Sequence, residues 1–408
     1  GSYLVAGICG YKTVDSMIDC TNHGDINLPG TIVELHASTI SEFRVAGIVC
    51  YTSKNGSGFV SDGKITLNGT YGCEMSVAGS VAFHYNTISG EQKSSTKIEI
   101  SGDCSKGLVV GGVVGYTYVN VSDLEYNGSI NITKDAVIGT KCYIGGCAGL
   151  LMSAKGTSYS SPSGVYCNDS TNNGAITING TINCAPYIGG VVGYNYVGVS
   201  GAKVYSLSNL TNNVAITLGA DGNVPSNNLY IAGCVGHTEG NVTTATNSGA
   251  ITVSGSNTDG NSYIAGCVAD AGTAYTLSGL TNEAAILCDG TVKSARLGGV
   301  GGYIGIIENS LNTGSVTFTG SATTDSHCHG ITYYAKEVKG CVNGSETDPK
   351  KGKLEYKSQN GKAVYLAGLA RQITTLAEDC VNYGSLYLSE ASNGTIYLGG
   401  IISAGDTG

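Results

Sequence analysis

The sequence lacks tryptophan altogether and has only 5 prolines among 408 residues. Charged residues make up 12%, about half of the usual share, which is too few for a solvated helical protein. Glycine, in contrast, occurs 63 times, about twice its average frequency. Much glycine with little proline, and without a collagen triplet, favours a protein of strands and turns over a disordered one.

Long apolar runs and basic clusters are also missing. No run reaches the roughly 18 apolar residues that a membrane-spanning helix needs, so we expect no membrane insertion by this chain. Lysine and arginine are scattered, apart from a short group around Lys350 and Lys351, and the net charge is −9. Nucleic-acid binding normally needs a clustered basic surface, so we expect no nucleic-acid partner.

One phrase recurs along the whole chain. Its clearest copy is Tyr-Ile-Gly-Gly-Val-Val-Gly-Tyr at 187–194, followed by Thr-Asn-Asn-Val-Ala-Ile-Thr-Leu at 211–218. The last glycine of the Gly-Gly or Ala-Gly pair marks twelve units, at intervals of 31 to 44 residues. These marks are Gly7, Gly47, Gly79, Gly112, Gly146, Gly190, Gly233, Gly266, Gly299, Gly330, Gly368 and Gly400. A period in this range is typical of a solenoid.

An asparagine recurs in the second half of most units. The unbroken row is Asn172, Asn212, Asn247, Asn282, Asn312, Asn343 and Asn382. Asparagine tolerates the left-handed backbone of turns, and stacked side-chain amides can bond to one another. We therefore expect these residues to form a structural ladder along one corner of the solenoid.

Short alternation and β-branched residues predict three strands in the clearest unit, at 187–192, 204–207 and 215–218. Stacked units then predict an all-β protein, a right-handed parallel β-helix of about 11–12 coils. We expect residues 1–408 to be a single repeat solenoid and a fragment of a longer chain. A β-propeller is the alternative, but its blades need four antiparallel strands in about 40 residues, and these units hold too few strand residues.

Alternation along the first strand assigns its side chains to two faces. The aliphatic position of Ile188 is expected in the core, and the position before it outside. Tyrosine occupies that outer position in four consecutive units: Tyr143, Tyr187, Tyr230 and Tyr263. A tyrosine has a flat apolar face and a polar tip, so this row is a candidate ligand-binding face for a sugar or a protein. The simpler alternative is that the stacked rings only stabilise the sheet.

The position of Val191 poses a problem, because it is apolar in most units although alternation places it outside. Either the glycine pair forms a bulge that turns this residue inward, or loops or a partner cover the sheet. An uncovered apolar stripe would itself mark an interaction surface.

Fifteen cysteines are present without any Cys-x-x-Cys motif, and most follow the repeat like small buried apolar residues. Two pairs, Cys234 with Cys267 and Cys341 with Cys380, fall in adjacent units, where disulfide geometry is feasible. The only metal-like cluster, His327-Cys328-His329, has no evident third ligand. We therefore expect no metal and no cofactor.

Catalysis by a β-helix lyase or glycosidase needs carboxylates gathered in one groove. Here the 30 acidic residues lie mostly in variable turns, and we find no two units with carboxylates at strand positions in clear register. Nucleophile motifs are missing as well. The sequence therefore predicts a non-catalytic protein.

The repeated phrase resembles the GLUG-type repeat of bacterial surface and adhesin-like proteins. The resemblance covers nearly the whole chain and is best from residue 143 to 320, where Gly145-Gly146, Gly189-Gly190 and Gly298-Gly299 fit well. It implies an extracellular or cell-surface module that acts as a stalk and binds a host or cell-surface glycan or protein, and it transfers no catalytic residues. The alternative function is a polysaccharide-degrading β-helix enzyme, a lyase or glycosidase.

Overall fold

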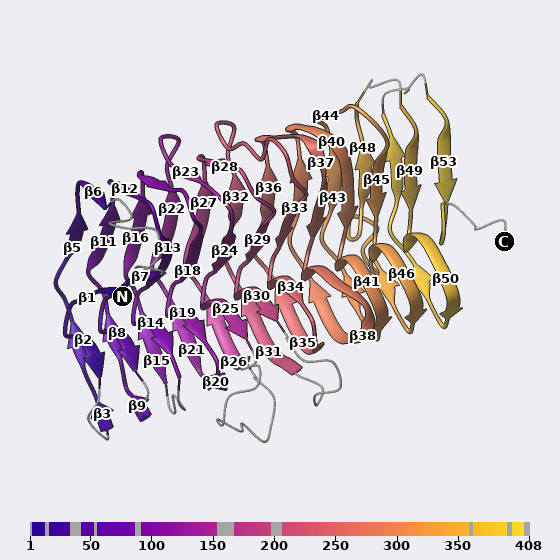
Figure 1. Ribbon diagram of the computed structural model, residues 1–408. Helices are drawn as coiled ribbons and strands as arrows, with labels where there is room; N and C mark the ends of the chain where they lie inside the picture. The colour runs from indigo at the N-terminus through magenta and orange to yellow at the C-terminus, as the bar shows by residue number, and fades with distance from the viewer. Residues whose placement is uncertain are drawn as a thin grey trace.

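A computed structural model describes residues 2–12, 16–32, 42–52, 55–85, 91–152, 167–196, 206–358, 362–389 and 394–403. Strands stack one after another along an elongated body, from the indigo N-terminal end to the yellow C-terminal end (Figure 1). Every strand pairing among these residues is parallel, and paired strands lie one repeat apart in the sequence. The all-β, parallel, solenoid-type arrangement is confirmed, and antiparallel propeller blades are excluded. The described residues contain no helix that could cross a membrane.

The described residues of the clearest unit form four strands, where three were expected. They are β29 (Pro186–Gly189), β30 (Val192–Tyr196), β31 (Ser206–Asn212) and β32 (Ile216–Leu218). The single strand expected at 187–192 was wrong, because the chain bends at Gly190 and Val191 and continues in a different sheet. The strand expected at 204–207 lies partly outside the described residues.

Three long sheets result. The first sheet consists, in order, of β1 (Ser2–Ala6), β7 (Glu42–Ala46), β13 (Glu74–Ala78), β18 (Leu108–Gly111), β24 (Cys142–Gly145), β29, β33 (Leu229–Ala232), β37 (Ser256–Ala265), β40 (Thr291–Gly298), β45 (Ser326–His329), β49 (Val364–Ala367) and β53 (Ile396–Gly399), with β44 (Ser321–Ala322) also paired to β40.

The second sheet begins after each glycine pair. The strands at that position are β2 (Cys9–Lys12), β8 (Val49–Thr52), β14 (Val81–His84), β19 (Val114–Thr117), β25 (Ala148–Met152), β30, β34 (Val235–Thr238), β38 (Val268–Asn282), β41 (Gly301–Glu308), β46 (Thr332–Lys339) and β50 (Ala370–Glu378).

The third sheet closes the unit. Its strands are β5 (Ile26–Leu28), β11 (Lys64–Leu67), β16 (Lys97–Ile100), β22 (Ser129–Ile132), β27 (Ala175–Ile178), β32, β36 (Ile251–Val253), β39 (Ile286–Cys288), β43 (Val316–Phe318), β48 (Leu354–Tyr356) and β52 (Leu386–Leu388).

One apolar core runs through the stack. It contains the aliphatic row of Ile188, whose members in the inner units are fully buried. It also contains Val191 and its equivalents Cys234 and Cys267, because the bend at the glycine pair turns this position inward. The bend between two sheets therefore explains the second apolar row, and neither a bulge within one sheet nor a covering partner is needed.

Packing requires the second glycine of the pair in every unit before the last. A Cβ at Gly233 would overlap both the carbonyl oxygen of Gly266 in the next unit and the side-chain amide of Asn247. The same two kinds of clash recur in seven other units, at Gly7, Gly146, Gly190, Gly266, Gly299, Gly330 and Gly368. The glycine mark and the asparagine mark of the sequence are thus two halves of one contact, in which the amide fills the space that a side chain would need.

The asparagine row is a continuous hydrogen-bonded chain. From Asn172 to Asn382, each Nδ2 donates to the Oδ1 of the next asparagine at 2.7–2.8 Å. Each Nδ2 from Asn212 onward also donates to a turn carbonyl, as Asn247 does to Gly249 at 3.0 Å. All members except Asn382 are fully buried. An unsatisfied buried amide costs about 1–3 kcal/mol, so these bonds make the buried row tolerable.

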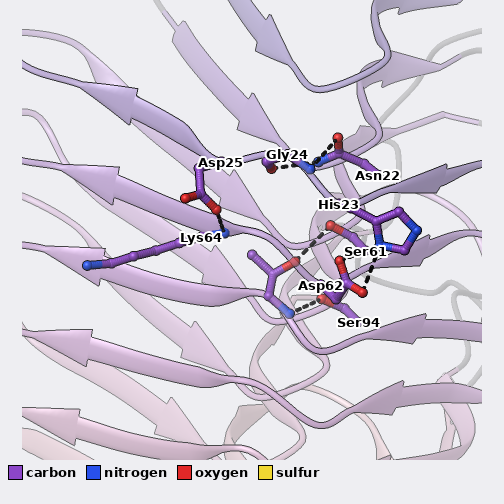
Figure 2. Close-up of polar contacts among 9 residues, drawn as sticks. Asn22, His23, Gly24, Asp25, Ser61, Asp62, Lys64 and Ser94 are labelled. Carbon is purple, nitrogen blue, oxygen red and sulfur yellow. Dashed lines mark hydrogen bonds and ion pairs between the residues drawn. The ribbon is translucent and has the colours of Figure 1, made fainter.

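Other residues hold the ladder position in the first units. Strand register places Ser61, Ser94 and Tyr126 in succession between Asn22 and Asn172. Asn22 Nδ2 donates to the carbonyl oxygen of Gly24 at 3.1 Å, a bond within its own turn (Figure 2). The amide chain therefore begins at Asn172.

A buried imidazole predicts sensitivity to acid. His84 on β14 is fully buried, and among the described residues neither ring nitrogen has a hydrogen-bond partner. Burial, and then the charge of Lys12, lowers the pKa of His84 from 6.5 to about 3. Between pH 6.5 and about 3, His84 is therefore protonated in the unfolded chain and neutral in the folded chain. The stability linked to His84 is fully present above pH 6.5 and is lost as the pH falls towards 3.

Through His84, the free energy of unfolding falls by about 1.4 kcal/mol for each pH unit from 6.5 down to about 3. We expect His84→Leu to remove this part of the pH dependence. Urea unfolding of both proteins over the same pH range measures the difference. The control is His23→Leu, whose side chain is 72% exposed in the parent. An identical change of slope in both variants would show that burial is not the cause.

Candidate functional site

The outer faces of the first and second sheets meet at an inward bend that follows the stack, and side chains from the two faces contact each other across it. On either side of one glycine bend, the rings of Tyr187 and Tyr194 lie 4.9 Å apart between centroids. Beneath them, a Cβ at Gly189 or Gly193 would strike backbone atoms, so the two sheets approach closely. We call this feature the outer groove.

Two register rows form its walls. The first-sheet wall consists of Leu4, Arg44, Ser76, Val109, Tyr143, Tyr187, Tyr230, Tyr263, Arg296, His327, Tyr365 and Tyr397. The second-sheet wall consists of Tyr11, Tyr51, Phe83, Tyr116, Leu150, Tyr194, His237, Asp270, Tyr303, Tyr334 and Gln372.

The four tyrosines singled out in the sequence lie together in the middle of the first wall. Tyr187 and Tyr230 stack at 4.7 Å with their planes 17° apart, and Tyr230 and Tyr263 stack at 5.0 Å and 3°. Tyr143 lies 5.8 Å from Tyr187 at a tilt of 50°. Burial raises the pKa of Tyr143 and Tyr263 to about 12. Because the inner rings cover one another, this part of the groove offers ring edges and hydroxyls rather than open ring faces.

Towards the N-terminal end the outer groove opens into a pocket of about 190 Å³. There the first wall has the small side chains of Ser76 and Val109 where later units have tyrosine. The second wall contributes Phe83 and Tyr116, and the Tyr116 hydroxyl donates to the sulfur of Met152 at 3.4 Å. The full lining is Glu42, Arg44, Glu74, Ser76, Phe83, Val109, Tyr116, Lys141, Leu150 and Met152.

Four charged side chains surround this pocket as two ion pairs. Lys141 Nζ donates to Glu74 Oε1 at 2.7 Å. Arg44 pairs with Glu42, and its guanidinium carbon lies 3.8 Å from the centroid of the Phe83 ring. The pocket therefore joins an aromatic floor to an edge that carries both signs of charge.

Glu42 and Glu74 are direct partners on neighbouring strands β7 and β13. The expectation that no two units place carboxylates in the same strand register was therefore wrong. A signal existed, since each glutamate stands three residues before the core valine of its unit, Val45 or Val77. Asp325 holds the same place in its unit, but only Glu42 and Glu74 belong to consecutive units, so a search for features common to all units passes over them.

The sequence His327-Cys328-His329 does not assemble a metal site. Both imidazoles are fully buried, and His327 Nε2 hydrogen-bonds to Asp325 Oδ2 at 2.8 Å. Burial outweighs this contact and lowers the pKa of His327 to about 4. Within the described ranges, no three His, Cys, Asp or Glu side chains are grouped so that they could hold a metal ion.

All fifteen cysteines are free thiols. Burial raises the pKa of most of them, for example to about 12 for Cys104, and a protonated thiol is a poor nucleophile. Cys341 and Cys380 precede the register partners Val342 and Val381. A hydrogen bond from Cys341 lowers the pKa of Cys380 to about 6. The adjacency expected for this pair is present without a disulfide bond.

Comparisons of the chain with protein-family models, curated proteins and solved structures give no match.

Proposed function

We propose that this chain is a non-catalytic, secreted or cell-surface stalk that binds a glycan or protein partner through its outer groove. In this proposal the stack is a right-handed β-helix of about 11–12 coils, built as an array in which each unit buries its neighbour's core face. The resemblance to GLUG-type repeats supports the location and the adhesin-like role.

The pocket is the observation that carries the binding role. Farther along the first wall the rings of Tyr187, Tyr230 and Tyr263 pack on one another, whereas at Ser76 and Val109 the wall is open. An apolar lining with a few polar groups at fixed positions is typical of ligand sites. The parallel strands beneath it supply a rigid frame, which keeps the cost of ordering the site on binding low.

Filling the pocket tests this role. Ser76→Tyr would continue the tyrosine row and occupy the space, so we expect binding to an array of glycans and surface proteins to fall at least tenfold. The matched control is Thr177→Tyr, which adds the same ring to a half-exposed position on the third sheet. Unfolding midpoints of both variants establish that they are folded.

The double variant Tyr187→Ala with Tyr230→Ala separates the stacked row from the pocket. Loss of binding in this variant alone would place the partner on the stacked tyrosines. Loss in Ser76→Tyr alone would place it in the pocket. Unchanged binding in both variants would contradict a role for the groove.

A polysaccharide-degrading enzyme is the second candidate, and the register of Glu42 and Glu74 favours it. Strands in register lie about 4.8 Å apart, close to the roughly 5–5.5 Å between the carboxyl groups of retaining glycosidases. Each carboxylate here already accepts a hydrogen bond from a cation, which is why binding is our first proposal. Release of reducing ends from a polysaccharide panel by the parent, abolished in Glu74→Gln, would establish the enzyme instead.

A further inference from the structure

We infer that the pocket holds a single neutral pyranose ring, one uncharged sugar residue of a glycan, against Tyr116 and beside Glu74. This inference rests on the proposed function. It adds the chemical class of the ligand and the residues that would select it.

The size of the pocket limits the ligand to one ring. Its volume of about 190 Å³ is below the roughly 300–1,000 Å³ of pockets for drug-sized molecules. In the first wall, the short side chains of Ser76 and Val109 lie between the longer ones of Arg44 and Tyr143. Arg44 and Lys141, from these two flanking units, also line the pocket. The gap in the first wall covers two strand spacings, about 10 Å along the stack. This length suits one pyranose ring and is too short for a folded peptide segment.

Among the described residues, neither of two aromatic rings beside Tyr116 stacks flat on it, and Leu150 is its register partner in the next unit. The Tyr116 ring is tilted by 56° against Phe83 and by 62° against Tyr118. The face of an aromatic ring carries partial negative charge and attracts C–H groups with partial positive charge. One side of a pyranose presents such C–H groups. Burial raises the pKa of Tyr116, so its hydroxyl stays neutral.

The charges at the edge favour a neutral polyol. Glu42 and Glu74 balance Arg44 and Lys141, so a ligand with a net charge would meet a like charge without gaining an unpaired opposite one. The carboxylate side chains of Glu42 and Glu74 are 40% and 36% exposed. An ionised carboxylate has about four acceptor positions, so each can accept sugar hydroxyls beside its ion pair. Sugar hydroxyls both donate and accept, which matches acceptors and cationic donors placed side by side.

Titration of the full chain with small sugars tests this assignment. The probes are the methyl glycosides of glucose, galactose and mannose, with glucuronate and glucosamine as charged analogues. We expect at least one neutral glycoside to bind at least tenfold more tightly than both charged sugars. Tyr116→Ala should weaken its binding at least tenfold, while Tyr116→Phe, which keeps the ring face, should retain it.

A change of charge gives a second, independent readout. Glu74→Gln leaves Lys141 without its carboxylate, so the relative affinity for glucuronate over the neutral glycoside should rise at least tenfold. A parent that prefers a charged sugar, or equal binding of the neutral glycoside by Ser76→Tyr and the parent, would overturn the inference. Array binding that persists while no free neutral sugar binds would overturn it too, yet leave the proposed function standing. If the chain binds neither the array nor any free neutral sugar, both the inference and the proposed function are wrong.

Discussion

Replacing Asn247 with alanine is expected to lower the free energy of unfolding by about 3 kcal/mol or more. Asn247 is fully buried in the middle of the ladder, where its Nδ2 donates to Asn282 and its Oδ1 accepts from Asn212, both at 2.8 Å. Alanine would leave an unpaired donor on Asn212, an unpaired acceptor on Asn282 and a void at the turn. Urea unfolding of the full chain measures the change.

The control for this variant is an asparagine one residue after a ladder position. Asn213 is exposed, and its Nδ2 donates to Asn173 at 2.8 Å in a second, outer row. Water replaces such a bond readily, so Asn213→Ala should change the free energy of unfolding by no more than about 0.5 kcal/mol. Equal changes in the free energy of unfolding at positions 213 and 247 would mean that the buried amide chain stabilises the fold no more than an exposed hydrogen bond does.

Gly233→Ala is expected to be more damaging still, by about 4 kcal/mol or more, or to prevent folding. The added methyl group would overlap the carbonyl oxygen of Gly266 and the amide of Asn247, and neither can move without breaking the bonds of adjacent units. Overpacking alone costs about 1–3 kcal/mol, and here ladder bonds would be lost as well. Soluble yield and the midpoint of thermal unfolding are the measurements.

The chain supplies a matched control for this substitution. Gly400 holds the same place in the repeat, yet no atom lies within 4 Å of a Cβ built on it. Gly400→Ala should therefore leave the midpoint of unfolding unchanged. A loss as large as that of Gly233→Ala would show that glycine is needed for its backbone freedom rather than for space.

The repeat made the parallel stack predictable, because a unit of about 33 residues cannot bury its own apolar face and needs neighbours above and below. Local alternation also identified the aliphatic row of Ile188. It failed at Gly190 and Val191, since alternation assumes one continuous strand and cannot register that the chain changes sheets there. Val191 is apolar because that bend turns it towards the core. The sequence shows the apolar residue but does not show the bend that explains it.

The pocket escaped prediction for a different reason. It exists where the units depart from their common pattern, with Ser76 and Val109 in place of tyrosine and with Glu42 and Glu74 in register. Aligning the units by sequence brings out the positions that they share. It therefore pointed to the tyrosine row, whose rings pack mainly on one another. In an array of near-identical units, a site for a partner is created by the exceptions.

The amide chain from Asn172 to Asn382 also has a direction. In each of its six links the donor belongs to the N-terminal partner. From Asn212 onward, the turn carbonyls that also accept from the Nδ2 groups, such as that of Gly249, prevent a single amide from turning over. The side-chain dipoles therefore add instead of cancelling, and each bond polarises the next. The row of amides is therefore electrically polar along the stack, with the positive ends of these amides directed towards the C-terminal end.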